Sequence, residues 1–271
     1  EFKPDFVKGV VVNVTGPVIY AAHRLGYPTF IHEQNSIPGR CNKFLSRYVD
    51  LIGISFESSR ELFKSGKVLY TGNPCSEEAI KKDAISKSKF GLSEHKKLVL
   101  IVMGSLGASK VNEFFKNSIK LFNNKDYEVL YVTGNNSYES FSKIKVPSNV
   151  KVVPYIEDLT RIMKKADIMV SRAGASTLSE IEALCVPSIL IPSPYVPDNH
   201  QYKNAMDLVN KKCAIIVEEK DLKGDILIRK IDELIKNDKE LAEMKKNLND
   251  SGIKNSATFI YENLKKLIDR K

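Results

Sequence analysis

Tryptophan is absent from this chain of 271 residues, and cysteine and histidine are scarce, with four of each. The cysteines are isolated and form no C-x-x-C pair, so we expect free thiols in a reducing compartment. No histidine stands at ligand spacing from a cysteine, and no D-x-D motif is present, so we expect no metal site. No apolar run is long enough to span a bilayer. These absences favour an ordinary globular protein.

Acidic residues are the minority, because 42 lysine and arginine residues outnumber 33 aspartate and glutamate residues and leave a net charge of +9. Such a balance favours anionic partners: phosphorylated ligands, an anionic membrane surface or nucleic acid. The lysines are spread in pairs along the chain rather than gathered in one block, and no RNA- or DNA-binding motif is present. We therefore expect solvated basic surfaces and no nucleic-acid partner.

Strand and helix signals alternate along the whole chain. Short apolar runs predict strands at residues 10–14, 29–32, 49–55, 68–71, 98–102, 127–133, 150–153, 166–170, 187–191 and 214–217. Amphipathic segments between them predict helices, and three further helices end the chain. Continuous apolar strands alternating with helices are typical of a parallel sheet covered on both faces.

A polar connector near residues 86–96 separates two such series. The sequence predicts an α/β protein with two Rossmann-like, doubly wound parallel-sheet domains, the first of them truncated. We place the first domain at residues 1–74, with the last helix, 253–271, packing back on it, and the second domain at residues 75–252.

The stretch from Ser171 to Glu180 reads S-R-A-G-A-S-T-L-S-E, between a predicted buried strand and a predicted helix. Gly174 permits a tight turn and the close approach of another molecule. The N–H groups and the positive dipole end of a helix start attract oxygen-rich ligands. Thr177-x-x-Glu180 also fits a capping box, in which both residues serve only the helix, and Ser176 is a second candidate cap. Spacing alone favours capping.

Three more stretches carry polar groups at predicted strand or helix ends. Residues 104–108, G-S-L-G-A, suit a phosphate or simply a tight turn, but they match neither a dinucleotide fingerprint nor a P-loop. Residues 198–204, D-N-H-Q-Y-K-N, suit sugar hydroxyls or an N-cap with an exposed polar face. Residues 32–35, H-E-Q-N, follow a strand, where His32 and Glu33 suit acid–base chemistry or merely a solvated loop.

Taken together, five motifs resemble one family, the MurG peptidoglycan N-acetylglucosaminyltransferases. Their order and spacing agree over the chain from Lys3 to the last helix, which makes the resemblance specific although each motif alone is weak. The motifs are His32-Glu33-Gln34-Asn35, Gly72-Asn73-Pro74, Gly104-Ser105-Leu106-Gly107-Ala108, Arg172 to Glu180, and His200-Gln201-x-x-Asn204.

The resemblance implies a GT-B fold, with no metal and no cofactor, and inverting transfer of GlcNAc from UDP-GlcNAc to undecaprenyl-diphospho-MurNAc-pentapeptide. This reaction converts lipid I to lipid II at the cytoplasmic face of the cell membrane, where a basic peripheral protein fits. The implied UDP-GlcNAc site comprises Asn35, Ser105, Gly107, Ile156, Ala175, Ser176, Thr177, Leu178, Ser179, Glu180, His200, Gln201 and Asn204. By position, Ser105 would contact the diphosphate and the backbone of Ile156 the uracil. Glu180 would bind the ribose hydroxyls.

The sugar would lie against Gln201 and Asn204, with His200 beside them and Asn35 reaching in from the first domain. The resemblance thus reverses the preference for capping at Glu180, because a ribose diol offers a carboxylate two donors.

Several departures concern the acceptor side. The family's first glycine-rich loop, which carries its usual base, is missing from this sequence, and we expect the chain to be a fragment. A second glycine-rich loop is replaced by residues 10–13, V-V-V-N, and Cys75-Ser76 stand where the family often has arginine. The general base is therefore unassigned, with Glu33 and His32 as weak candidates.

Alternative functions remain open from the sequence. One is a non-catalytic UDP-sugar-binding protein, or half of a split transferase that needs a partner chain. Another is a different GT-B enzyme acting on UDP-GlcNAc, such as an epimerase, which would need no lipid acceptor. A nucleic-acid-binding module rests on charge alone.

Overall fold

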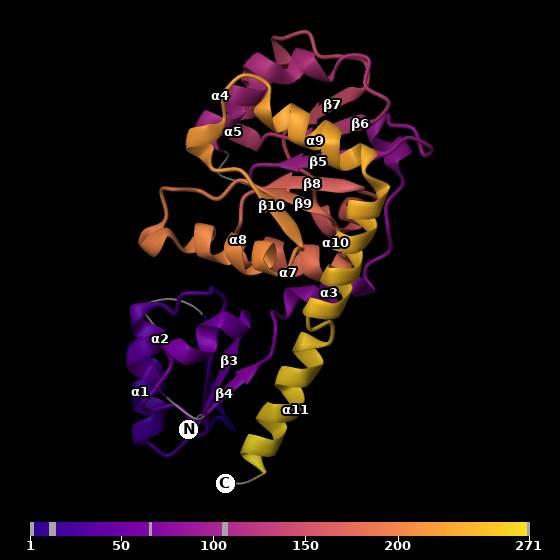
Figure 1. Cartoon of the computed structure of the whole chain (residues 1–271). Helices are drawn as coiled ribbons and strands as arrows, with labels where there is room; N and C mark the ends of the chain where they lie inside the picture. The colour runs from indigo at the N-terminus through magenta and orange to yellow at the C-terminus, as the bar shows by residue number, and fades with distance from the viewer. Residues whose placement is uncertain (1–2, 11–14, 65–66, 105–107, 270–271) are drawn as a thin grey trace. The chain divides into compact units, whose positions relative to one another are not determined.

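The computed structural model describes residues 3–10, 15–64, 67–104 and 108–269. The chain forms two compact units (Figure 1). Unit 1 comprises Glu1–Glu78 and Gly252–Lys271, and unit 2 comprises Ala79–Ser251. Unit 1 is thus built from two segments that are distant in sequence, whereas unit 2 is continuous.

Unit 1 contains a parallel four-stranded sheet in the order β1-β2-β3-β4. Its strands are β1 (Val7–Val10), β2 (Thr29–Glu33), β3 (Leu51–Ile54) and β4 (Val68–Tyr70). Its helical elements are α1 (Thr15–Arg24), α2 (Arg40–Leu45), η1 (Glu57–Leu62) and α11 (Ser256–Ile268), and α3 (Cys75–Lys81) continues into unit 2.

Both faces of this sheet are buried, because successive side chains of a strand point to opposite sides. Ile31 belongs to a core cluster that includes Ile19 of α1 and Leu45 of α2. Its neighbour Phe30 packs on the other side with Ile260 and Leu264 of α11. The last helix therefore completes the core of a sheet made by the first strands.

A carboxylate fixes the start of this last helix. Glu77 accepts hydrogen bonds from the Thr258 backbone N–H, at 2.8 Å, and from its hydroxyl, at 2.7 Å. A negative charge at a helix N-terminus is stabilising, because it satisfies an unpaired N–H and opposes the positive end of the dipole.

Unit 2 contains a parallel six-stranded sheet in the order β10-β9-β8-β5-β6-β7. Its strands are β5 (Leu98–Val102), β6 (Glu128–Val132), β7 (Val150–Val153), β8 (Ile168–Ser171), β9 (Ser188–Leu190) and β10 (Ala214–Ile216). Its helices are α4 (Ser109–Ser118), α5 (Asn135–Ser142), α6 (Leu159–Met163), α7 (Ala175–Leu184), α8 (His200–Asn210), α9 (Ile226–Lys236) and α10 (Asp238–Ser251). Short 3-10 turns occupy Lys87–Phe90 (η2), Ile119–Phe122 (η3), Pro197–Asn199 (η4) and Glu219–Asp221 (η5).

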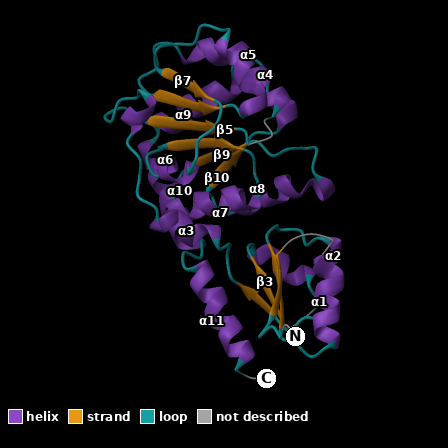
Figure 2. Cartoon of the chain, turned by 180° about the vertical axis from the view of Figure 1, so that it is seen from behind, coloured by secondary structure: helices purple, strands orange, loops and turns teal. Residues whose placement is uncertain are grey.

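The sheet of unit 2 is doubly wound. Strands β6 and β7 extend it on one side of β5, and β8, β9 and β10 extend it on the other. Figures 1 and 2 show α4, α5 and α9 on one face, with α7 and α8 on the opposite face. Side chains such as Val99, Ile101 and Val170 form one large core with Phe115 of α4 and Ile231 of α9.

The predicted fold class is confirmed: two parallel α/β sheets are present, with strands at 98–102 and 150–153 on the predicted residues. The first predicted strand, 10–14, meets the observed strand β1 only at Val10, because β1 begins three residues earlier, at Val7. Residues 11–14 of that prediction lie outside the described residues.

Candidate functional site

The strand order of unit 2 reverses between β5 and β8, and a cavity opens at this point. In open α/β sheets, ligands bind outside the carboxyl ends of the strands where the order reverses, because the connecting helices leave toward opposite faces there. The cavity has a volume of about 750 Å³, within the range of small-molecule sites. Its lining residues come from the turns after β5, β8 and β9: Met103, Gly104, Ala108, Ser109, Lys110, Arg172, Gly174, Thr177, Ser193, Tyr195, Val196 and Gln201.

The turn after β8 delivers a helix N-terminus to this cavity. Gly174 is the N-cap of α7, with extended backbone angles (φ −70°, ψ 142°), and Ala175 is the first helical residue. The predicted capping box is therefore wrong, since Thr177 is the third residue of the helix and cannot be its cap. Ser176, as the second residue, is likewise not the cap. The helix begins two residues earlier than a Ser176 cap would require and three residues earlier than a Thr177 cap would require, because Gly174 occupies the N-cap position.

The periodicity of α7 separates the six residues 175–180, which were expected to line a nucleoside together. Ser176 is exposed, and Thr177 and Glu180 are partly exposed. Leu178 is completely buried, Ser179 is buried with its hydroxyl bonded to the Ala175 carbonyl, and Ala175 is also buried. A helix turns about 100° per residue, so consecutive side chains cannot all face one ligand. The Leu178 and Ser179 side chains are therefore turned into the protein, and the nucleoside contacts expected of residues 175–180 stay a prediction.

Arg172, just before the turn, is held by a carboxylate that the sequence analysis missed. Its guanidinium donates to Glu219 Oε2 at 2.6 Å and to the backbone oxygens of Ile191, at 3.1 Å, and Pro192, at 3.3 Å. Only 14% of the Arg172 side chain and 5% of the Glu219 side chain are exposed. Glu219 also accepts a hydrogen bond from the Tyr195 hydroxyl at 2.9 Å. One carboxylate thus ties together the segments that follow β8, β9 and β10.

Residues of α8 approach the same cavity in different ways. Gln201 lines it, and its side-chain oxygen accepts from the Ser193 N–H at 2.9 Å. His200 Nδ1 lies 2.9 Å from the Pro197 carbonyl, which can only accept, so Nδ1 carries a proton. Asn204 is completely buried, and its side-chain amide donates to the Ala173 carbonyl at 3.3 Å. Asn204 therefore stabilises the turn after β8 from the protein interior.

The alternative considered for residues 198–204, an N-cap of the following helix, agrees with the structure in position but not in hydrogen bonding. Asn199 occupies the N-cap position, but its backbone is left-handed (φ 50°), and it makes no side-chain capping bond.

Two other expected donor-site segments lie at the same carboxyl edge of the sheet. Gly104 follows β5 with a φ of +83°, in the region that favours glycine. Ser105 and Gly107 lie outside the described residues. Ile156 follows β7 and is buried, beside the exposed Tyr155.

In unit 1, Glu33, one of the two residues considered for acid–base chemistry, forms hydrogen bonds within its own loop. Glu33 is buried, and its carboxylate accepts from the N–H groups of Asn35 and Gly39, both at 3.0 Å, and from the Asn42 amide at 2.8 Å. These bonds close the loop that carries Asn35. Glu33 is therefore an organiser of that loop in this structure rather than a base presented to a substrate.

His32 is also unsuited to the role of base. It is 2% exposed, and its Nε2 lies 2.9 Å from the Gly72 carbonyl. Burial lowers the pKa of His32, although the bond to Gly72 and the charge of Glu33 act in the opposite direction. A neutral ring then donates from Nε2 to Gly72. Its Nδ1 is buried and has no hydrogen-bond partner among the described residues.

Within the described residues, no cluster of three or more histidine, cysteine, aspartate or glutamate side chains is arranged to hold a metal ion. The helices of the described ranges include none with the length and apolar character needed to cross a membrane.

Comparison with known proteins identifies the family. The chain is 46% identical, over 275 positions, to the UDP-N-acetylglucosamine–N-acetylmuramyl-(pentapeptide) pyrophosphoryl-undecaprenol N-acetylglucosamine transferase 1 of Bacillus cereus. This match spans 100% of the chain and 76% of its relative. A transferase of the same name from Bacillus cytotoxicus matches equally well, with 46% identity and the same coverage. The chain belongs to the MurG family.

Domain and structural comparisons agree with membership in the MurG family. Residues 98–260 match the glycosyltransferase family 28 C-terminal domain, and residues 1–54 match its N-terminal domain. The crystal structure of Acinetobacter baumannii MurG superposes with a TM-score of 0.78 at 27% identity, covering 97% of this chain and 74% of that one. A UDP-GlcNAc 2-epimerase from Neisseria meningitidis, bound to UDP-GlcNAc, shares only the fold: its TM-score is 0.67 at 19% identity, covering 98% of this chain and 77% of that one.

Proposed function

We propose that this protein transfers N-acetylglucosamine from UDP-GlcNAc to the lipid-linked N-acetylmuramoyl-pentapeptide of peptidoglycan synthesis. The observation that carries the proposal is the 46% identity with curated transferases of this specificity, extending over the whole chain. The cavity at the strand reversal of unit 2 supports it, because a nucleotide sugar needs a site of this kind: helix N-termini for phosphates and polar side chains for sugar hydroxyls.

The donor is proposed to bind in this cavity with its ribose against the start of α7. Thr177 lines the cavity, and Glu180 stands one helical turn further on the same side of the helix. The GlcNAc group would lie toward Gln201, with His200 beside it. Asn204 would act indirectly, by holding the Ala173 carbonyl and thus the turn. The backbone near Ile156 is proposed for the uracil, and Ser105 and Gly107 are proposed for the diphosphate.

The reaction proposed is an inverting displacement. An acceptor hydroxyl attacks the anomeric carbon of GlcNAc, the bond from that carbon to the diphosphate oxygen breaks, and UDP leaves. A general base takes the proton of the hydroxyl. We leave this base unassigned, because Glu33 accepts three hydrogen bonds from the segment that follows it and His32 is buried.

Replacing Glu180 by alanine is expected to weaken UDP-GlcNAc binding at least tenfold. A carboxylate that accepts from two ribose hydroxyls contributes about 1.5–3 kcal/mol, which is roughly ten- to 150-fold in affinity. Isothermal titration calorimetry would measure the dissociation constants of the parent protein and of Glu180→Ala.

The matched control for this experiment is Glu139→Ala, which removes an exposed glutamate of α5 in the same unit. Equal binding by the parent and by Glu180→Ala would remove Glu180 from the donor site. Donor binding by a parent protein that transfers no sugar to the lipid-linked acceptor would favour the alternative of a UDP-sugar-binding protein or half of a split transferase.

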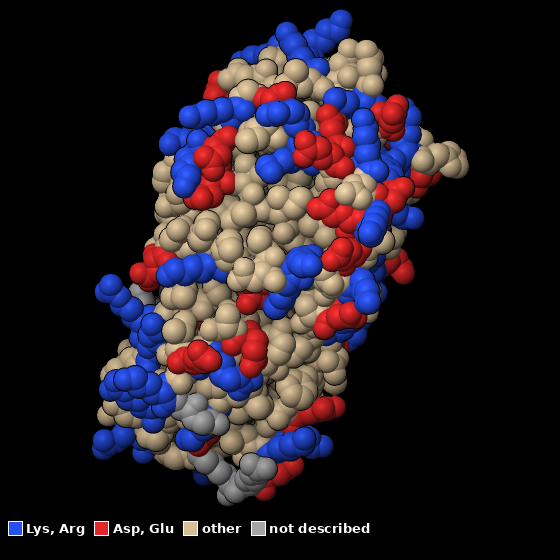
Figure 3. Space-filling model, in the orientation of Figure 1, with Lys and Arg blue, Asp and Glu red and all other residues tan. Residues whose placement is uncertain are grey.

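We also propose that the protein acts at the cytoplasmic face of the cell membrane, through the outer surface of α1 and α2. Tyr48 contacts the rings of Tyr20, His23 and Phe44, at centroid distances of 5.1, 5.6 and 5.3 Å. Phe44 is 51% exposed. Between residues 15 and 48 there are four basic residues (Arg24, Arg40, Lys43 and Arg47) and one acidic residue, the buried Glu33. Figure 3 shows Lys and Arg gathered over this part of unit 1.

The double variant Arg24→Ala/Arg47→Ala is expected to bind anionic vesicles about 30-fold more weakly. Each basic residue near an anionic leaflet contributes about 1 kcal/mol, and two such losses are roughly additive. Sedimentation with phosphatidylglycerol-containing vesicles would measure the change. The control Lys245→Ala/Lys246→Ala removes the same charge from the exposed side of α10. Equal losses in both variants would mean that net charge, rather than this surface, drives binding.

A further inference from the structure

The donor cavity contains two cationic side chains among its described lining residues, Lys110 and Arg172. The diphosphate of a nucleotide sugar brings negative charge that must be balanced when water is displaced. The helix starts of α4 and α7 contribute partial positive charge, but a full charge of opposite sign is worth more at short range. The two cations are therefore the candidates for a direct phosphate contact.

Arg172 is already committed within the protein. Its guanidinium is neutralised by Glu219, which lies 2.6 Å from Nη2, and its Nη1 donates to the two backbone carbonyls of Ile191 and Pro192. A phosphate bound by Arg172 would have to share a guanidinium whose charge is already balanced by the buried carboxylate of Glu219. Arg172 thus shapes the cavity wall rather than balancing a ligand.

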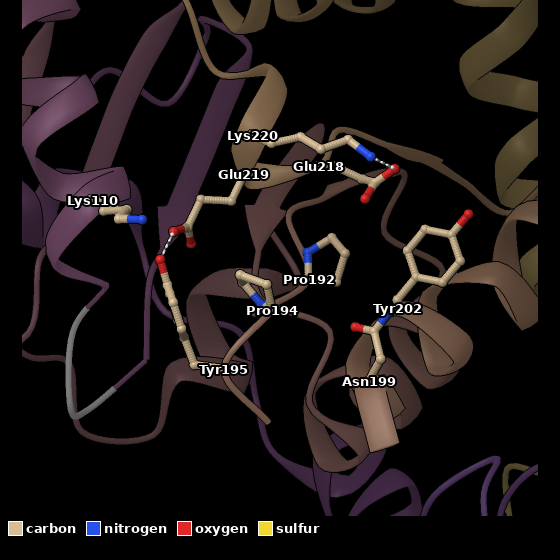
Figure 4. A pocket seen from close by; sticks show the side chains of 9 residues that line it. All are labelled: Lys110, Pro192, Pro194, Tyr195, Asn199, Tyr202, Glu218, Glu219 and Lys220. Carbon is tan, nitrogen blue, oxygen red and sulfur yellow. Dashed lines mark hydrogen bonds and ion pairs between the residues drawn. The ribbon is translucent and has the colours of Figure 1, made fainter. Parts of the chain in front are cut away.

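Lys110 is placed differently. It lies in the first turn of α4, two residues after the N-cap residue Ala108. Its ammonium lies 5.3 Å from the centroid of the Tyr195 ring, and it forms no ion pair with a carboxylate in the described ranges. Figure 4 shows its nitrogen directed toward the bond between Tyr195 and Glu219. Lys110 also lines a smaller pocket of about 180 Å³, which shares Tyr195 with the donor cavity.

The surroundings keep this ammonium charged. A hydrogen-bonding interaction with the Tyr195 side chain and, to a lesser degree, the negative charge of Glu219 raise the pKa of Lys110. A ring face beneath a cation attracts it without neutralising it, and a lysine chain can move by several single-bond rotations. Lys110 is therefore charged, held near the cavity and able to reach a ligand.

We infer that Lys110 is the residue that balances the diphosphate charge of the donor, with Tyr195 and Glu219 holding its ammonium beside the cavity. This inference rests on the proposed function, because it takes the bound molecule to be a nucleotide sugar. A lysine suits the role, since its ammonium is a compact charge that can approach oxygens of either phosphate.

The test compares ligands that differ only in their phosphates. Calorimetric titration and displacement would give the affinities of uridine, UMP, UDP and UDP-GlcNAc for the parent protein and for Lys110→Met, which keeps the length of the chain and removes the charge. UDP and UDP-GlcNAc are expected to bind about tenfold or more weakly to the variant, whereas uridine stays within about twofold. Lys110→Arg should recover most of the loss. Lys120→Met, an exposed lysine just beyond the same helix, is the control.

Two results would overturn the inference while leaving the function intact. In one, Lys110→Met binds UDP as tightly as the parent. In the other, the affinities for uridine and for UDP fall by the same factor in Lys110→Met, which would mean that Lys110 maintains the shape of the site rather than binding the phosphates. Failure of the parent protein to bind UDP-GlcNAc would instead overturn the proposed function itself, and the inference with it.

Discussion

Replacing Glu219 by alanine is expected to lower the free energy of unfolding of unit 2 by about 3–5 kcal/mol, because the buried guanidinium of Arg172 then lacks a counter-charge. Arg172 and Glu219 are 14% and 5% exposed, so solvent screens their interaction little. The same change leaves the Tyr195 hydroxyl without its acceptor and loosens the segment after β9 that lines the donor cavity. We therefore expect UDP-GlcNAc binding to weaken as well. Urea denaturation and calorimetry would measure the two effects.

The control for Glu219 is Glu243→Ala, which breaks a long and exposed ion pair with Lys212 (3.7 Å) in the same unit. Exposed pairs contribute little, so this variant should lose less than about 1 kcal/mol. Glu219→Gln keeps the shape and one acceptor, and it should fall between the two. A loss below about 1 kcal/mol in Glu219→Ala would contradict the assignment of this carboxylate as the link between the three strand ends.

Gly72→Ala is expected to destabilise unit 1 by about 2–5 kcal/mol. Gly72 has a φ of +65°, and an added methyl group would meet Ser256 Oγ and lie 3.0 Å from Ile253 Cβ. A non-glycine residue in the left-handed region and a clash in a packed site each cost about 1–3 kcal/mol. Ser256 is fully buried and donates to the Ile253 carbonyl at 2.9 Å, so it cannot simply rotate away. Hydrogen exchange of unit 1 amides would report the loss.

Gly26→Ala is the control that separates the cost of the left-handed backbone from the cost of the steric clash. Gly26 also has a positive φ, +78°, in unit 1, but an added methyl group would meet nothing within 4 Å. It should show only the conformational part of the cost. If both variants lost the same stability, the packing of α11 against Gly72 would not contribute.

The sequence was informative about the fold because the central strands of unit 2 are buried on both faces. Residues 98–102 and 168–170 form uninterrupted apolar runs that are buried in β5 and β8, as expected for a covered parallel sheet. The start of α7 was misjudged because two hydroxyl residues suggested a side-chain cap, whereas Gly174 occupies that position.

The candidate site was less predictable, because its key contacts join residues that are distant in sequence. Glu219 stands in the run Glu218-Glu219-Lys220-Asp221, which reads as a solvated charged turn. Only the fold brings it against Arg172, 47 positions earlier. Similarly, the polar residues of H-E-Q-N at 32–35 suggested an available acid or base. The loop folds back, however, and three N–H groups of residues 35–42 donate hydrogen bonds to the carboxylate of Glu33.

The discontinuity of unit 1 has a consequence for synthesis on the ribosome. Glu77 and Thr258, which meet at the start of α11, are 181 positions apart, a distance that takes about 10–40 s to translate at 5–20 residues per second. Throughout that interval, the face of Phe30 lacks Ile260 and Leu264, whereas unit 2 is contiguous and is completed first. The nascent chain therefore carries an open apolar sheet face for far longer than a hairpin or helix takes to form, and an exposed face of this kind promotes aggregation.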